Sequence, residues 1–69
     1  MKTFTGLTHD DKIGTIELMI VIGGGFASKI GEAYRRADNS NRRILENAFA
    51  DMLNQYAEVY YDMAKYRQD

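Results

Sequence analysis

The chain of 69 residues contains no cysteine, no proline and no tryptophan. Without cysteine, neither a disulfide nor a thiolate zinc site can stabilise the fold. A domain of about this size buries a small core and usually needs a metal, disulfides or self-association for firm stability. We therefore expect self-association. Hydrophobic residues make up 45% of the chain and charged residues 28%, which is typical of an ordered globular protein.

An excess of charge is also lacking, since the formal net charge is −1. This balance argues against a general nucleic-acid-binding protein and against an acidic mimic of DNA. The longest uncharged stretch, residues 18–28, would rise about 16 Å as a helix, roughly half of a bilayer core. Acidic residues precede it, so we expect neither a membrane span nor a secretory signal and place the protein in the cytoplasm.

Apolar and small residues recur at steps of three and four through most of the chain, which predicts α-helices. The first series is Ile13, Ile16, Ile20, Gly23, Ala27, Ile30, Tyr34 and Ala37. The second is Leu45, Phe49, Met52, Tyr56, Val59, Met63 and Tyr66, widened by Ile44, Ala48, Leu53 and Tyr60. Between them, the segment 38–41 is rich in residues that favour turns and helix caps.

These patterns predict an all-α fold, an antiparallel hairpin of two helices over residues 11–37 and 41–67, in one domain over the whole chain. A lone hairpin buries only one face per helix, so we expect two copies to pair into a four-helix bundle, with a dimer favoured over larger assemblies. Tyrosines suit a partly wet interface because each ring has a polar tip. The candidate oligomer interface is Phe49, Met52, Tyr56, Tyr60 and Met63.

The N-terminal residues are expected to stand outside this hairpin. Thr8 or Asp10 is predicted to cap the first helix. Residues 1–9 form a short arm, of which residues 1–7 are expected to be extended and to pack on a neighbour.

Three consecutive glycines lie within the first predicted helix. With the preceding Ile20–Ile22, the pattern Gly23-x-Gly25-x-x-Ser28 looks like the strand and phosphate-binding turn of flavin- and nicotinamide-dependent oxidoreductases. No later segment is typical of a strand, so we expect no dinucleotide and no other cofactor. A helix that continues through the glycines is favoured, and a kink or break is the alternative. The candidate helix-packing or hinge residues are Gly23, Gly24, Gly25, Ala27 and Gly31.

Positive charge gathers at the predicted hairpin tip, where residues 29–43 sum to +3. Arginine side chains and the free amides of a helix start can together bind an anion such as phosphate or an acidic protein patch. Alternatively, these side chains are simply solvated. The candidate anion or partner contacts are Lys29, Arg35, Arg36, Arg42 and Arg43.

Catalytic constellations are poorly represented. His9 is the one histidine, and with Asp10 and Asp11 it is better explained by helix capping than by metal binding. No serine has a histidine companion fixed by the pattern, so a nucleophilic triad is not indicated. We therefore expect a protein that is not an enzyme and binds no metal.

The segments Gly23-Gly24-Gly25-Phe26, Ala33–Asp38, Asn41-Arg42 and Ala48-Phe49 are similar to short uncharacterised accessory proteins of tailed bacteriophages and prophages. The resemblance covers roughly residues 22–50. It implies an accessory or host-takeover factor, a group that includes inhibitors of bacterial defence systems. The hairpin also loosely resembles phage proteins that sequester cyclic nucleotides, although their binding residues have no match here.

We therefore expect a non-catalytic protein of the host cytoplasm that binds itself and inhibits a host defence protein by direct binding. One alternative is capture of an anionic nucleotide by the arginine-rich tip or the glycine segment. A second alternative is a purely structural oligomer. Direct binding of nucleic acid is least favoured, because the net charge is near zero.

Overall fold

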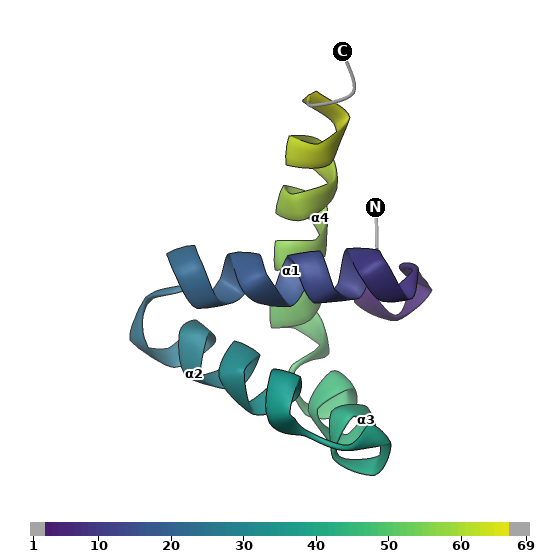
Figure 1. Cartoon of the computed structure of the whole chain (residues 1–69), viewed down its shortest axis with the longest axis vertical. Coiled ribbons are helices and arrows are strands. Elements are labelled where there is room, and N and C mark those ends of the chain that lie inside the picture. Colours follow the sequence, from purple (N-terminus) through teal and green to yellow (C-terminus); the bar gives the residue numbers. More distant parts are fainter. Residues whose placement is uncertain (1–2, 67–69) are drawn as a thin grey trace.

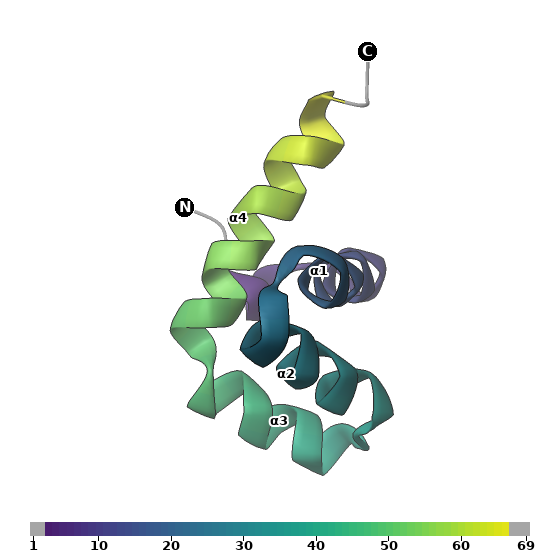
Figure 2. The ribbon, with the colours of Figure 1, turned by 90° about the vertical axis from the view of Figure 1, so that its left-hand side faces the viewer.

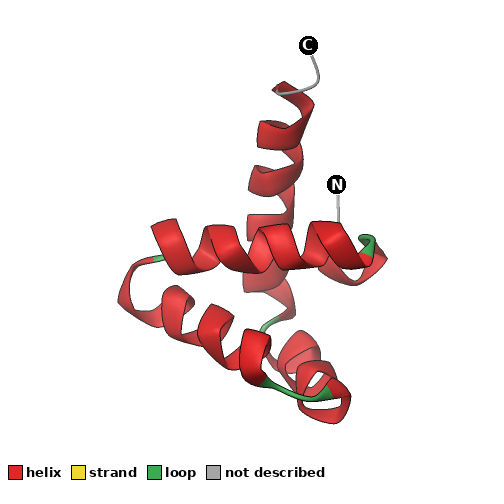
Figure 3. Ribbon diagram, viewed as in Figure 1, coloured by secondary structure: helices red, strands yellow, loops and turns green. Residues whose placement is uncertain are grey.

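The computed structural model describes residues 3–66, with the side chains of residues 3–64, and this part of the chain is helical apart from short connections (Figure 1; Figure 3). A 3-10 turn, η1 (Phe4–Gly6), precedes four α-helices. The helices are α1 (His9–Ile22), α2 (Gly24–Arg36), α3 (Asn39–Ala48) and α4 (Ala50–Tyr66). The all-α class predicted from the sequence is therefore confirmed, with four helices in place of two.

The helices form a compact globule from which the C-terminal half of α4 projects. α2 runs back beneath α1, and α4 crosses behind α1 (Figure 1). From the side, α1, α2 and α3 are stacked beside the lower turns of α4, and its upper turns extend past them (Figure 2). The principal dimensions are 36 × 24 × 19 Å, and α1 packs mainly against α2 and α4. No helix within residues 3–66 is long and apolar enough to cross a membrane.

Two short polar side chains fix where α1 and α3 begin. Thr8 caps α1, since its Oγ1 accepts a hydrogen bond from the Asp11 backbone N–H at 3.2 Å. Asp38 caps α3, because its Oδ1 accepts from the Asn41 backbone N–H at 2.9 Å. Each bond satisfies a first-turn N–H that has no partner within its helix. Thr8, one of the two predicted caps, is thus confirmed.

The predicted helix over residues 11–37 is wrong, because the chain reverses at the glycine run. The Gly23 backbone N–H donates to the Met19 carbonyl at 2.8 Å and closes the last turn of α1. Gly24 then has a φ of 72°, in the left-handed region that favours glycine and commonly ends helices. The break, which was the alternative at this position, folds α2 back against α1. Since α1 extends to Ile22, no strand precedes the glycines as a dinucleotide turn would require.

The predicted helix over residues 41–67 is also wrong, because it is divided at Phe49. Phe49 has φ −118° and ψ 34°, which is not helical, although its N–H still donates to the Leu45 carbonyl at 2.9 Å. Its ring contacts the Phe26 ring edge-on, with 5.9 Å between the centroids. The bend between α3 and α4 therefore lies at a contact with α2, and no glycine or proline marks it. Residue 67 lies outside the described residues.

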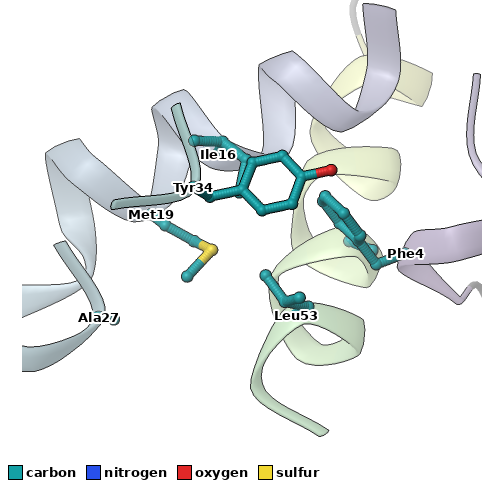
Figure 4. Close-up of a cluster of buried hydrophobic side chains, with 7 residues drawn as sticks. Phe4, Ile16, Met19, Ala27, Tyr34 and Leu53 are labelled. Carbon is teal, nitrogen blue, oxygen red and sulfur yellow. The ribbon is translucent and has the colours of Figure 1, made fainter. Parts of the chain in front are cut away.

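The core lies where α1, α2, α4 and the N-terminal turn meet. Its buried apolar members are Phe4, Ile16, Met19, Ala27, Tyr34, Leu53 and Ala57. Figure 4 shows the side chains of Phe4, Tyr34 and Leu53 gathered beside α1. Two of the seven, Ala27 and Ala57, are small, and the other five are large side chains that fill the space between the elements.

The N-terminal turn is part of this core. Phe4 is only 1% exposed, and its backbone N–H donates to Asn54 Oδ1 of α4 at 2.9 Å. The expectation that residues 1–7 are extended and pack on a neighbour is therefore wrong for η1, which is a turn packed on the protein's own helices. Residues 1 and 2 lie outside the described residues.

Gly31 allows α1 and α2 to approach closely. A Cβ at this position would lie 2.9 Å from Ile20 Cγ1 and 3.2 Å from the Ile16 carbonyl oxygen. Among the candidate helix-packing or hinge residues, Gly31 thus lies in the α1–α2 contact and Ala27 in the core. Gly23 and Gly24 form the reversal, and Gly25 is exposed just after it.

We expect Gly31→Ala to lower the free energy of unfolding by about 1–3 kcal/mol, because a backbone carbonyl of α1 cannot move aside for the added methyl group. Gly25→Ala is the matched control, since nothing lies within 4 Å of a Cβ there. The higher helix propensity of alanine should make this control neutral or stabilising by up to about 1 kcal/mol. Urea unfolding followed by circular dichroism measures both, and equal effects would contradict the close α1–α2 packing.

Candidate protein-binding surface

The five basic residues predicted as a contact site have two different environments. Arg42 is half-buried, its Nε donates to the Tyr34 carbonyl at 3.0 Å, and its Nη2 donates to the Arg35 carbonyl at 3.1 Å. Its guanidinium also lies 4.9 Å from the centre of the Tyr34 ring. These bonds satisfy carbonyls at the end of α2, so Arg42 connects α2 to α3. The remaining four, Lys29, Arg35, Arg36 and Arg43, are exposed.

We expect Arg42→Gln to destabilise the fold by about 1–2 kcal/mol, because two charge-assisted hydrogen bonds and the stacking on the Tyr34 ring are lost. Arg43→Gln is the control, since it removes the same charge from an exposed neighbour and should change stability by less than about 0.5 kcal/mol. Thermal unfolding of both variants measures the difference. Equal loss of stability in the two variants would show that the change in net charge, and not the loss of the Arg42 hydrogen bonds, is responsible.

Tyr34 connects three elements through its ring and its hydroxyl. The hydroxyl donates to Glu46 Oε2 of α3 at 2.8 Å, and Lys12 Nζ of α1 lies 3.8 Å from the same oxygen. The ring is edge-on to that of Phe4, with 5.4 Å between centroids. Burial, and next the hydrogen bond to Glu46, raise the pKa of Tyr34 to about 12. This cluster is a structural link, with its polar atoms paired to one another.

The raised pKa of Tyr34 predicts a loss of stability at high pH. The native state holds the phenolic proton more tightly than the unfolded chain, whose tyrosines ionise near pH 10. The contribution is therefore complete below about pH 10 and is lost as the pH rises through about 12. Denaturant unfolding across this interval should show a steeper loss for the wild type than for Tyr34→Phe. Parallel losses in the two proteins would contradict the assignment.

Groups with catalytic or metal-binding chemistry are dispersed over the surface. His9 is exposed in the first turn of α1, and Asp51, Glu58 and Asp62 are exposed along α4. Within residues 3–66, no group of three or more histidine, cysteine, aspartate or glutamate residues could hold a metal ion.

An apolar face covers α4 and the neighbouring reversal between α1 and α2. We define the apolar face as Ile22, Phe26, Phe49, Met52, Tyr56, Val59 and Met63. Its members on and just before α4 recur at steps of three and four residues, so they lie along one side of the helix. The Phe26–Phe49 ring contact joins this stripe to the start of α2. In Figure 2 the reversal between α1 and α2 is in front, with the lower turns of α4 beside it.

The apolar face is only partly covered by the rest of the chain. Phe49, Met52 and Tyr56 pack against the core and are half-buried. The exposed members are Phe26 at 62%, Ile22 at 56%, Met63 at 43% and Val59 at 42% of their surface. Monomeric proteins rarely leave large apolar side chains exposed together, and such patches commonly bind protein.

The carboxylates of α4 lie outside the apolar face. At about 100° per residue, Asp51, Glu58 and Asp62 lie roughly 90–140° around α4 from the centre of the stripe. The face therefore carries no carboxylate of α4, and a partner can cover it without burying an unpaired charge.

A hollow of about 430 Å³ adjoins the face between α1 and the projecting half of α4. It is lined by Gly14, Glu17, Leu18, Tyr60, Met63 and Ala64. Gly14 lies directly beneath the Tyr60 ring, which leaves no room for a Cβ on α1. Tyr60, a predicted interface residue, thus contacts α1 of its own chain along one edge of the face.

Searches for similar proteins found no match to a family model, to a curated protein or to a solved structure. The interpretation of this surface therefore depends on the chain's own residues.

The sequence pattern and the structure select overlapping sets of surface residues. Four of the five predicted interface residues, Phe49, Met52, Tyr56 and Met63, are members of the apolar face, and Tyr60 borders it. Ile22 and Phe26 were not predicted as contacts. They flank the glycine run, and the chain reversal at this run leaves both side chains exposed. The glycine run is therefore the sequence signal that could have pointed to them.

Proposed function

We propose that this chain is a non-catalytic helical protein that acts by binding another protein through the apolar face. The exposed part of that face is the observation that carries the proposal, because Ile22, Phe26, Val59 and Met63 remain 42–62% exposed in the folded chain. Burying one such side chain contributes about 1.5–3 kcal/mol, so a partner that covers several gains substantial affinity. The dispersal of His9 and the carboxylates supports a binding role over a catalytic one.

Two partners are consistent with this proposal. The resemblance to phage accessory proteins favours a host protein, for example a defence component met in the host cytoplasm. The pairing of two copies into a helical bundle is the other. Capture of an anionic nucleotide has weaker support, because the Arg42 guanidinium already donates to two carbonyls at the end of α2.

Site-specific photo-cross-linking in the expressing cell tests the proposed function. We expect p-benzoylphenylalanine in place of Val59 or Phe26, both exposed members of the face, to give defined protein adducts. The same replacement at Glu58, which is exposed on another side of α4, is the control and should give none. Absence of adducts from both face positions, or equal adducts from Glu58, would overturn the proposal.

A further inference from the structure

We propose that the partner of the apolar face is a basic amphipathic helix of another protein, whose lysine or arginine side chains pair with carboxylates along the edges of the face. The inference rests on the proposed function, because it names the chemistry of the partner that covers the same face. Two features of the surface carry it: the sign of the charge that borders the face, and the linear form of the stripe along α4.

One edge of the apolar face is a row of carboxylates on α4. Asp51, Glu58 and Asp62 are separated by steps of seven and four residues, so they lie along one side of the helix. All three are exposed, and none of them is in an ion pair within the part of the chain that the structure describes. The sequence over residues 50–64 contains no lysine and no arginine. This edge therefore presents unpaired negative charge beside the stripe.

The opposite edge of the face also carries a carboxylate. Glu17 of α1 is exposed and lines the hollow of about 430 Å³ together with Met63, the last member of the stripe. Tyr60, which contacts α1 at this hollow, lies on the other side of the stripe from the α4 carboxylates. On α2, Lys29 is exposed one turn after Phe26. Among these described side chains, four carboxylates thus border the face and one ammonium group opposes them.

The stripe has the form that accepts a helix. Its members recur at steps of three and four residues from Phe49 to Met63, over about 21 Å of helix. The reversal that carries Ile22 and Phe26 lies beside the lower turns of α4 and adds exposed apolar area (Figure 2). A helix with its own apolar stripe at the same steps packs lengthwise on such a surface. The residues that flank the partner's stripe then lie over the two edges of the face.

The sign of the bordering charge selects among partners with an apolar stripe. Residues 44–69 sum to −3, so a second copy of the chain or an anionic surface brings like charge to the same edges. Basic side chains at these edges instead form exposed ion pairs, each of which raises affinity by up to about five-fold. They also accelerate association at low salt. Their aliphatic stems cover apolar surface while their charged ends reach the carboxylates.

Isothermal titration calorimetry of the full chain with a synthetic helical peptide tests the sign of the charge. The peptide has leucine at steps of three and four residues and lysine at the flanking positions, and matched peptides have glutamine or glutamate in place of lysine. At low salt, the lysine peptide should bind about ten-fold more tightly than the glutamine peptide, and the glutamate peptide more weakly than both. Salt at about 0.5 M should remove most of this preference. Equal binding of the lysine and glutamine peptides, or no measurable binding of the lysine peptide, overturns the inference.

Neutralising carboxylates tests whether the α4 edge makes the ion pairs. Glu58→Gln combined with Asp62→Asn should weaken binding of the lysine peptide about five-fold and change binding of the glutamine peptide by less than about two-fold. Asp10→Asn combined with Glu32→Gln is the matched control, because it removes the same charge from the first turn of α1 and the second half of α2. This control should change both affinities by less than about two-fold. Equal weakening by the two double variants assigns the preference to net charge and overturns the inference.

A third pair of variants tests whether the peptides bind on the apolar face. Val59→Asn should weaken the lysine and glutamine peptides alike, by about five-fold or more, because a polar amide replaces an apolar contact. Val21→Asn is the control, since Val21 is 79% exposed and lies outside the face. Circular dichroism checks that each variant is folded. Unchanged binding by Val59→Asn places the peptides elsewhere on the chain and overturns the inference.

The photo-cross-linking experiment separates failure of this inference from failure of the proposed function. Mass spectrometry of the adducts at Val59 identifies the segment that is attached. Adducts on a basic helical segment support the inference. Adducts on a neutral or acidic segment, or on a second copy of the chain, overturn it and leave protein binding through the face standing. No adduct from either face position overturns both.

Discussion

The reversal of the chain at Gly24 is the constraint on which the rest of the structure depends. With a φ of 72°, Gly24 ends α1 and turns α2 back along it. A continuous helix over residues 11–37 would be about 40 Å long, which exceeds the longest dimension of the molecule, 36 Å. The turn instead lets Gly31 approach the backbone of α1, and it places Phe26 against Phe49. The bend between α3 and α4 lies at this second contact.

The Tyr34 cluster joins the small core to α3. Buried small residues such as Ala27 and Ala57 bring helices together but contribute little apolar area of their own. The fold therefore depends on a few large side chains, among them Phe4, which comes from outside the helices. Tyr34 joins this turn to α3, because its ring contacts Phe4 and its hydroxyl is bonded to Glu46. Such a paired polar group adds specificity without leaving a buried donor unsatisfied.

The periodicity of the sequence predicts which residues form helices and which sides of them are apolar, but not where the helices bend. Steps of three and four continue through Gly23 and Phe49, because a stripe has the same spacing whether the helix is straight or divided. At Gly23 the glycine run offered a break as an alternative, whereas at Phe49 no glycine or proline marks the bend, which lies at a tertiary contact with Phe26. Phe4 lies outside any periodic segment, so its burial had no local signal. The surface stripe on α4 was predictable, because its apolar residues recur at steps of three and four from Phe49 to Met63.

Under the proposed binding role, the division of α4 into a packed half and a projecting half couples folding to binding. Phe49, Met52 and Tyr56 serve the core, and the same stripe continues into water at Val59 and Met63. An isolated helix end gains little stability from propensity alone, so the projecting turns are stabilised chiefly by whatever covers their apolar side. A partner that binds only the folded chain adds its binding free energy to that of folding. Since Phe49, Met52 and Tyr56 of the core and the exposed Val59 and Met63 lie along one side of one helix, burial in the core and burial by the proposed partner both stabilise that helix.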